Sequence, residues 1–380
     1  MNSLIKLIKL NYSIFKNILN YSNKKINFLF YSEKKDYQKY ALSIIEVLSK
    51  KYPNQILYVS SDPDDRIDDL EIQNLFIGRG FLMNFFFLII KAKYFFLTLT
   101  DLDNHSLKKT KNIKKYVYYF HSPVSTFKNY TETAFDNYDI ILCCGEYHCK
   151  EIRKRENIKN LPKKDLIKTG YFYFDYLLEK ISLKNDPEYI LIAPSWNYDH
   201  KQFINENFIK IIELLLKKKY KIIFRPHPEH FKRSNKILNE IKKKFNQFPD
   251  FYFDEFSENL NSMEKAKYLI TDASGISIEY LLLFKRPIFY LNDKDKIHNK
   301  NYLDFSDLDT IDKTIKEQFG FIFYEKDIEN LDSLINESNQ VFQSKKPLLN
   351  DFINHNFFNF GNTKKKFNLI IDKQILNNNK

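Results

Sequence analysis

Two histidines follow predicted buried strands and could exchange protons with a substrate. His121 comes directly after the aromatic run Tyr116–Phe120, and His227 lies between prolines in Arg225-Pro226-His227-Pro228. Proline interrupts strand and helix, so these prolines hold Arg225 and His227 in a stiff loop. An imidazole titrates near neutrality, and a guanidinium forks onto phosphate oxygens. The residue types predict proton transfer beside a phosphate. The alternatives are that His227 is a structural histidine bonded to a backbone carbonyl and that His121 is a packing residue.

A Ser/Gly loop opens an apolar helix further along the chain, in the order strand Tyr268–Thr271, loop Thr271-Asp272-Ala273-Ser274-Gly275, helix Ile276–Phe284. Unpaired N–H groups and the dipole at the start of a helix attract phosphate oxygens. Gly275 permits close approach, Ser274 can cap and donate, and Glu279 could reach a sugar or ribose hydroxyl. The alternative is that Asp272 or Ser274 only caps the helix and Glu279 faces solvent.

These polar residues share one position, which is the end of a short apolar run. The runs read as buried parallel strands and occur at Ile26–Tyr31, Gln55–Ser60, Tyr94–Thr100, Tyr116–Phe120, Ile140–Cys144, Tyr189–Ala193, Tyr220–Phe224, Tyr268–Thr271 and Ile288–Leu291. Pro194-Ser195-Trp196-Asn197 follows one more of them. Ligands of open parallel sheets bind beyond the carboxyl ends of the strands, so these loops predict one site.

The runs form two series that meet near residue 180. We expect a first Rossmann-like domain over residues 1–180, a second over 181–345, and a C-terminal segment over 346–380. Phe360-Gly361-Asn362 is a turn signal, and the apolar-periodic stretch Phe367–Leu376 predicts a closing helix that crosses back to the first domain. A chain of 380 residues is ordinary for two α/β domains.

Composition limits the partners. Lys and Arg exceed Asp and Glu by 60 − 48 = 12, which would favour anionic substrates, anionic lipid or nucleic acid. AT-rich coding, with abundant Lys, Asn, Ile, Phe and Tyr, explains the same excess. No basic patch interleaved with recognition aromatics and no nucleic-acid-binding module is found, so we expect no nucleic-acid partner.

The cysteines indicate the compartment. Cys143, Cys144 and Cys149 lie too close together to form a disulfide framework and lack zinc-site spacing. With no signal peptide of the usual design, a reducing cytoplasm is the simplest expectation.

Two apolar stretches bear on membrane contact. Residues 1–19 mix Leu and Ile with Lys6, Lys9 and Lys16, as a basic amphipathic helix on a membrane would, or as a first helix packed on its own domain would. The run Phe81–Ile90 is too short to span a bilayer and predicts a buried helix.

Two Asp-x-Asp pairs, Asp62-Pro63-Asp64 and Asp101-Leu102-Asp103, match the pattern by which some glycosyltransferases hold a nucleotide through a divalent ion. The pattern is weak, and the first pair lies in an acidic run typical of a solvated loop. We expect no metal site.

Taken in order, the motifs resemble those of CDP-glycerol glycerophosphotransferases, the teichoic-acid primases and polymerases and their relatives in capsule synthesis. The segments that carry the resemblance are His121-Ser122-Pro123 with Lys128, Phe135-Asp136-Asn137-Tyr138-Asp139, Gly170-Tyr171 with Asp175, Ala193-Pro194-Ser195-Trp196, Arg225-Pro226-His227-Pro228, Thr271-Asp272-Ala273-Ser274-Gly275, Lys285-Arg286-Pro287 and Asn359-Phe360-Gly361. The sequence departs from the family pattern at Phe120 and Ser122, where Trp and Gly are usual, and lacks the Arg expected after Gly170.

The resemblance implies a GT-B-like fold, with two Rossmann-type domains facing across a cleft, and transfer of a glycerol phosphate or related polyol phosphate from a CDP-linked donor to a glycan or lipid-linked glycan hydroxyl. His121 is implied as the base. The predicted catalytic residues are His121 and His227, and the predicted donor-binding residues are Arg225, Ser195, Thr271, Asp272, Ser274, Gly275, Ile276 and Glu279. The scheme releases CMP and requires no metal or other cofactor. The family also implies peripheral attachment to the inner face of the cell membrane.

Two alternatives stay open. A glycosyltransferase of the same fold would use a nucleotide sugar and attack an anomeric carbon. A non-catalytic scaffold at a membrane surface would explain the basic N-terminus but not the polar residues at the strand ends.

Overall fold

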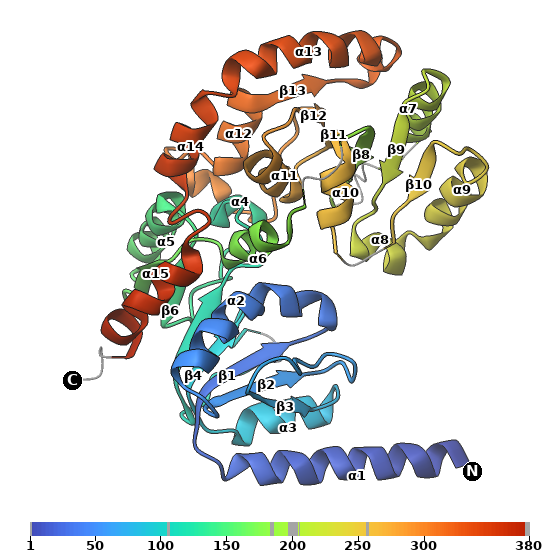
Figure 1. Cartoon of the computed structure of the whole chain (residues 1–380). Coiled ribbons are helices and arrows are strands. Elements are labelled where there is room, and N and C mark those ends of the chain that lie inside the picture. Colours follow the sequence, from blue (N-terminus) through green and yellow to red (C-terminus); the bar gives the residue numbers. More distant parts are fainter. Residues whose placement is uncertain are drawn as a thin grey trace.

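The computed structural model describes residues 2–104, 107–182, 186–196, 204, 206–255 and 258–376. Two α/β halves lie one above the other in Figure 1, the first in blue and green and the second in yellow and orange. Each half has its own parallel sheet, with seven strands in the first and six in the second. The predicted α/β fold with two Rossmann-type halves is therefore confirmed.

The sheet of the first half has the strand order β3-β2-β1-β4-β5-β6-β7. Its strands are β1 Ile26–Ser32, β2 Ile56–Ser60, β3 Gln73–Phe76, β4 Ala92–Leu97, β5 Ile113–Tyr119, β6 Ile140–Cys143 and β7 Asp165–Lys168. The helices are α1 Asn2–Ser22, α2 Lys35–Lys51, α3 Phe81–Ile89, α4 Thr126–Asn129, α5 Glu146–Lys159 and α6 Phe172–Lys180. Every residue of β2 and β6 is buried, because helices cover both faces of the sheet.

The sheet of the second half has the order β10-β9-β8-β11-β12-β13. Its strands are β8 Tyr189–Ile192, β9 Lys221–Phe224, β10 Phe251–Phe253, β11 Ala266–Thr271, β12 Ile288–Leu291 and β13 Gly320–Phe323. The helices are α7 Glu206–Lys217, α8 Pro228–Arg233, α9 Asn235–Phe245, α10 Leu260–Lys265, α11 Ile276–Phe284, α12 Ile311–Phe319 and α13 Leu331–Lys345, with 3-10 turns at Tyr302–Phe305 and Glu325–Asn330.

The predicted strands are all present, and the strands that prediction missed are β3, β7, β10 and β13. Each of these lies at an edge of its sheet. Edge strands are short and half-exposed, as in β3 and β7, so they lack the continuous apolar run by which a buried strand is recognised.

The C-terminal segment returns to the first half. After α14 (Leu348–Asn356), α15 (Thr363–Ile370) packs on α2 and α6, and a π-helical turn, Ile371–Leu376, ends the described chain. Figure 1 shows this red segment against the green helices of the first half. The Phe358 N–H donates to the Cys144 carbonyl at 2.8 Å, and the Lys364 N–H donates to Asp175 at 2.8 Å.

The surface helices differ from expectation. The run Phe81–Ile90, predicted as a buried helix, forms α3, but Phe81 is 76% exposed and Leu88 is 56% exposed. The prediction of burial is wrong for this outer stripe, because α3 packs on the sheet with one face only, through Phe86 and Phe87. Beside it, α1 buries Ile14 and Ile18. No helix in the described part of the chain has the length and hydropathy to span a bilayer.

Gly170 allows the C-terminal segment to approach. Its φ is +105°, and a Cβ there would overlap the Phe358 carbonyl oxygen. We expect Gly170→Ala to lower the free energy of unfolding by about 2–4 kcal/mol, from the left-handed backbone and the forced displacement of the segment. Gly78→Ala is the control, since Gly78 also has a positive φ but only ordinary contacts around it. Urea unfolding measures both variants, and equal losses would contradict the close-approach argument.

Candidate active site between the two halves

The predicted site loops of the two halves touch one another. His121 and Ser122 follow β5 in the first half, and Gly275 is the N-cap of α11 in the second. A Cβ on Gly275 would overlap the Ser122 hydroxyl oxygen and press on Val124. Gly275 is therefore required where the two loops meet, and the N-terminal end of α11 lies against the His121 loop.

His121 lies among tyrosine rings. The ring centroids of Tyr37, Tyr40 and Tyr130 are each 6.1 Å from that of His121. Burial, with a smaller effect from the charge of Lys296, lowers the pKa of His121 to about 4. Within the residues that the structure describes, its enclosed Nδ1 has no hydrogen-bond partner. His121 is thus a neutral imidazole at neutral pH, as a general base must be, and Nε2 is the nitrogen left to reach a substrate.

His227 is the N-cap of α8. Its Nδ1 accepts a hydrogen bond from the Glu229 N–H at 3.2 Å, so the neutral ring carries its proton on Nε2. Its own N–H donates to Nδ1 of His230 at 3.1 Å. Burial first, and then the charge of Lys296, lower the pKa of His227 to about 3. The ring is held as a neutral hydrogen-bond donor.

Arg225 is engaged by a carboxylate. Its guanidinium donates to Asp254 at 2.6 Å and to the Glu258 carbonyl at 3.2 Å. The side chain of Asp254 is only 2% exposed. Asp254 therefore orients Arg225 and offsets part of the positive charge that the sequence assigned to phosphate binding.

Three other predicted donor-binding residues bond to one another or to the sheet. Asp272 accepts hydrogen bonds from the N–H and hydroxyl of Ser195 at 2.9 and 2.7 Å. Thr271 is fully buried, and its hydroxyl donates to the Ala193 carbonyl at 2.6 Å. Burial raises the pKa of Asp272. These contacts join the loops after β8 and β11, which places Ser195 and Thr271 behind the surface of the site.

The start of α11 remains at that surface. Ser274, Gly275 and Ile276 are each half-buried. The Ser274 carbonyl accepts from both the N–H and the hydroxyl of Ser277, at 3.1 and 2.7 Å. These bonds fix the first turn, and Ser274 lines a pocket with Lys296 and Lys128.

Glu279 lies inside the junction, not on the solvent side of α11. It is 5% exposed and contacts the Tyr171 hydroxyl at 3.1 Å and the Asn259 amide at 3.0 Å. Burial raises its pKa, and Lys39 opposes this shift. Both carboxyl oxygens are engaged by residues of the two halves, so the solvent-facing alternative is wrong.

Sequence reasoning missed Lys296, which acts electrostatically on both histidines. It lies in the charged loop after β12. That loop is also a strand end, which is the signal that could have found it.

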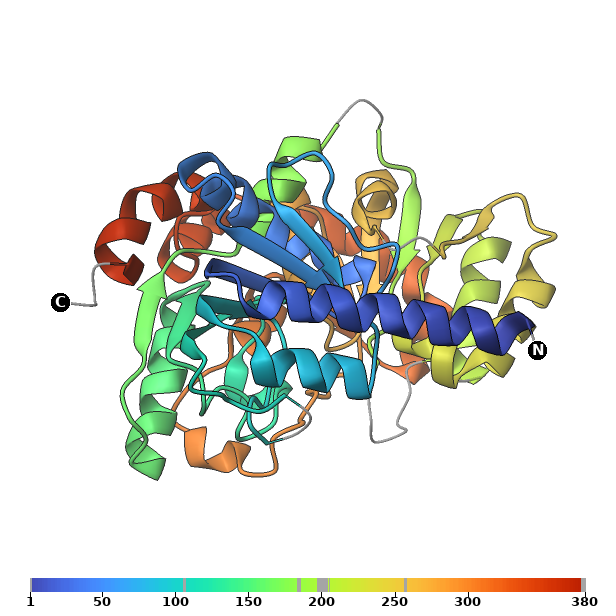
Figure 2. The same ribbon diagram turned by 90° about the horizontal axis from the view of Figure 1, so that it is seen from below.

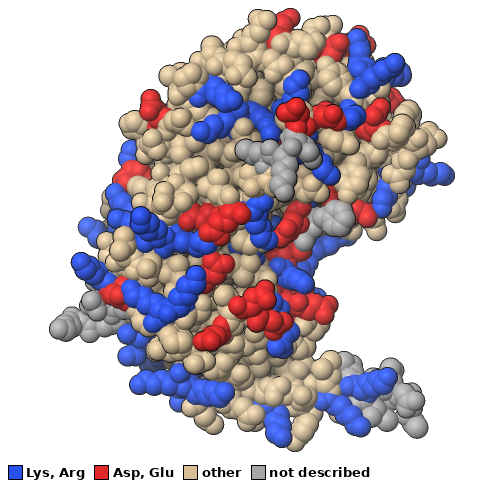
Figure 3. Space-filling view, viewed as in Figure 1, with Lys and Arg blue, Asp and Glu red and all other residues tan. Residues whose placement is uncertain are grey.

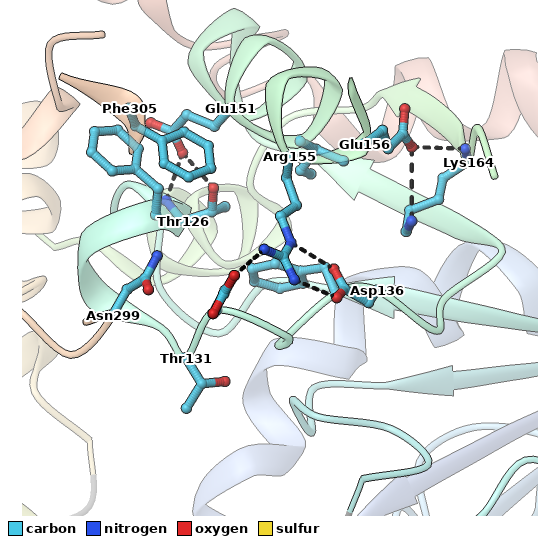
Figure 4. Close-up of a pocket in the computed structure, with 13 residues that line it drawn as sticks. Thr126, Thr131, Asp136, Glu151, Arg155, Glu156, Lys164, Asn299 and Phe305 are labelled. Atoms are coloured by element: carbon cyan, nitrogen blue, oxygen red, sulfur yellow. Dashed lines mark hydrogen bonds and ion pairs between the residues drawn. The ribbon is translucent and has the colours of Figure 1, made fainter. Parts of the chain in front are cut away.

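A second pocket, shown in Figure 4, contains none of the predicted site residues. Arg155 donates to Asp136 at 3.1 and 2.7 Å and to Glu132 at 2.5 Å. Asp136, part of a motif that resembles the family, therefore anchors α5 in this structure.

The Asp-x-Asp pairs are occupied by local hydrogen bonds. Asp101 accepts from Thr131 and Thr133, and Asp62 accepts from the Asp64 N–H. No cluster of three metal-ligating side chains occurs within the described ranges.

The lowered histidine pKa values can be measured directly. We expect the imidazole NMR signals of His121 and His227 to stay in the neutral form from about pH 8 down to about pH 5, whereas in urea-unfolded protein they titrate near 6.5. Because the unfolded chain then binds more protons, the free energy of unfolding falls as the pH drops from about 6.5 towards 4. Titration of either folded-state signal near 6.5 would show that the ring is solvated.

The chain matches, over residues 13–346, the family described as CDP-glycerol:poly(glycerophosphate) glycerophosphotransferase. No curated protein matches it significantly.

Solved structures show the same fold. The wall teichoic acid polymerase TagF is 18% identical with a TM-score of 0.62, over 93% of this chain and 89% of that one. A histidine-to-asparagine variant of TagF soaked with CDPG is 17% identical with a TM-score of 0.61, over 99% and 96%. A putative UDP-N-acetylglucosamine 2-epimerase from Listeria monocytogenes is 10% identical with a TM-score of 0.60, over 94% and 98%. Since the family match spans most of the chain, this protein belongs to the CDP-glycerol:poly(glycerophosphate) glycerophosphotransferase family.

Proposed function

We propose that this enzyme transfers glycerol phosphate from CDP-glycerol to a hydroxyl of a glycan or lipid-linked glycan and releases CMP. The observation that carries the proposal is that two neutral histidines, one from each half, both feel the charge of Lys296, which lines a pocket with the start of α11. His121 has the protonation state of a base, and His227 holds a donor proton on Nε2. Each state suits one end of a phosphoryl transfer.

In this reaction His121 takes the proton of the acceptor hydroxyl while its oxygen attacks the β-phosphorus of the donor. The new bond joins that oxygen to the β-phosphorus, and the bond to the bridging oxygen breaks. CMP leaves with the bridging oxygen, stabilised by His227 Nε2–H, by Arg225 and by the N–H groups of Gly275 and Ile276, since the Ser274 N–H already donates to the Asp272 carbonyl at 3.0 Å. Such fixed donors stabilise charge that develops in the transition state.

A lipid-linked acceptor would require the enzyme to meet a membrane, and α1 has a surface suited to it. Ile8, Tyr12, Phe15 and Leu19 form one stripe along the helix, and Ile8 and Tyr12 are 60% and 69% exposed. The rings of Phe15 and Phe85 stack at 5.3 Å, which continues the stripe onto α3. Figure 2 shows the two helices side by side on one face.

Basic residues border this apolar stripe. Lys9 and Lys16 are exposed, and each directly follows a residue of the stripe, Ile8 or Phe15, in the sequence of the helix. Figure 3 shows Lys and Arg side chains along the lower edge, where α1 lies. Exposed apolar groups beside lysines suit the interface of an anionic bilayer. The proposal therefore includes peripheral binding of the inner membrane surface through α1 and α3.

Replacement of the histidines tests the reaction. We expect His121→Asn and His227→Asn each to slow CMP release from CDP-glycerol by roughly 10² to 10⁴-fold, because each removes one proton-transfer or hydrogen-bonding group. His355→Asn is the control, since His355 is exposed on α14. Purified protein is incubated with CDP-glycerol, other CDP-polyols and UDP-sugars together with a glycan acceptor, and the nucleotide released is identified.

Release of UDP from a UDP-sugar, with CDP-glycerol left intact, would replace the proposal by a glycosyltransferase. If no nucleotide is released from any donor, the result would favour the non-catalytic scaffold at a membrane surface.

Charge reversal tests the membrane surface. We expect Lys9→Glu with Lys16→Glu to weaken binding to phosphatidylglycerol vesicles by about tenfold or more, since each lysine near an anionic surface contributes on the order of 1 kcal/mol. Phe81→Asp should weaken it further. Leu348→Asp, an exposed apolar residue on α14, is the control. Sedimentation with vesicles measures the binding, and unchanged binding of the double variant would exclude this surface.

A further inference from the structure

Lys296 lies in a loop that bridges the two halves. After β12 the chain leaves the second sheet, and the neighbours of Lys296 on both sides bond to Lys128 of α4. Asp295 forms an ion pair with the Lys128 ammonium, and the His298 N–H donates to the Lys128 carbonyl at 2.7 Å. Lys316 of α12 also pairs with Asp295, at 3.6 Å. Lys296 is therefore held in place by its flanking residues.

The surroundings of Lys296 are those of the active site. It lines a pocket with Ser274 and Ser277 at the start of α11, together with Tyr290 and Asp312. Its charge lowers the pKa of both His121 and His227, so it lies near both rings. In a phosphoryl transfer with the base at one end and the leaving group at the other, the phosphorus lies between these two histidines.

Lys296 has no counter-ion among the described residues. Lys128 and Lys316 of the same pocket each form an ion pair with Asp295, whereas no carboxylate of the described chain lies within 4.0 Å of the Lys296 ammonium. Asp272 and Asp312 affect it only at longer range. The Lys296 side chain is half-buried. An ammonium withdrawn from water without an anion costs free energy, and burial lowers the pKa of Lys296 accordingly.

The nearby carboxylates are already occupied. Asp272 accepts two hydrogen bonds from Ser195, and Asp312 accepts from the Ser125 N–H at 2.9 Å and from Asn129. The Tyr290 hydroxyl, which lines the same pocket and is 2% exposed, has no hydrogen-bond partner in the described chain. The Lys296 ammonium therefore has no counter-ion, and the Tyr290 hydroxyl no hydrogen-bond partner, among the described residues.

We propose that Lys296 is a further catalytic residue, whose ammonium binds the non-bridging oxygens of the donor's β-phosphoryl group as it passes to the acceptor. The inference rests on the proposed reaction. It gives to Lys296 the phosphate-binding role that the sequence analysis assigned to Arg225. The guanidinium of Arg225 is instead paired with Asp254. In the transition state the negative charge spreads over these oxygens, where a fixed cation is most effective.

Substitution of Lys296 by methionine removes the ammonium group and keeps an unbranched apolar side chain. We expect Lys296→Met to slow CMP release from CDP-glycerol by roughly 10² to 10³-fold, and Lys296→Arg to restore part of it. Lys296→Met should also weaken the binding of CDP by about tenfold or more. The affinity for CMP should stay unchanged, because CMP has no β-phosphate. Lys294→Met, on the exposed part of the same loop, is the matched control.

Thermal unfolding separates this role from a structural one. Removal of a half-buried charge without a counter-ion should leave the Tm of Lys296→Met equal to or above that of the wild type, whereas loss of a structural contact would lower it. A lowered Tm with equal loss of CDP and CMP binding would overturn the proposal.

Failure of the Lys296 inference can be distinguished from failure of the proposed reaction. If the wild type releases CMP and Lys296→Met binds CDP as tightly as it does, the inference fails and the reaction stands. If the wild type releases no CMP but Lys296→Met loses CDP selectively, the phosphate site stands and the reaction fails.

Discussion

Glu279 sits where the two halves meet, and the arrangement of the site depends on the hydrogen bonds at its carboxyl group. The Tyr171 hydroxyl lies 3.1 Å from Glu279 and 2.9 Å from the His121 carbonyl oxygen. A hydroxyl has one proton to donate, so it cannot donate to both. The Tyr171 hydroxyl therefore lies between two acceptors, Glu279 of the second half and the His121 backbone of the first. This chain of bonds runs from the second half to the backbone of the proposed base.

The sequence predicted the centre of each sheet well and its edges poorly. Central strands such as β2 and β6 are buried along their whole length, so their composition alone identifies them. The edge strands β3, β7, β10 and β13 owe their existence to a neighbour that supplies hydrogen bonds, and pairing leaves no local pattern. The same limit explains α3, because its sequence shows an apolar helix but not how much of it the rest of the fold covers.

Sequence analysis predicted where the candidate site residues lie in the fold, but not which of them other side chains engage. His121, His227 and the start of α11 follow from the rule that ligands bind beyond strand ends. Ser195 and Thr271 share that position, yet their hydroxyls bond Asp272 and Ala193, which only the three-dimensional arrangement reveals. Arg225 has the right chemistry, but its partner Asp254 is distant in sequence. Lys296 was overlooked because a lysine in a lysine-rich chain carries no signal until its missing counter-ion can be seen.

The return of the C-terminal segment makes the second half an insertion within the first. The chain leaves the first half after α6 and comes back through α14 and α15, so two connections cross the junction. One connection would act as a swivel, about which the second half could twist. Two separate connections define an axis, and the motion that keeps both intact is a hinge rotation about that axis. If the halves part, the His121 loop and the start of α11 separate along one direction and meet again in the same register.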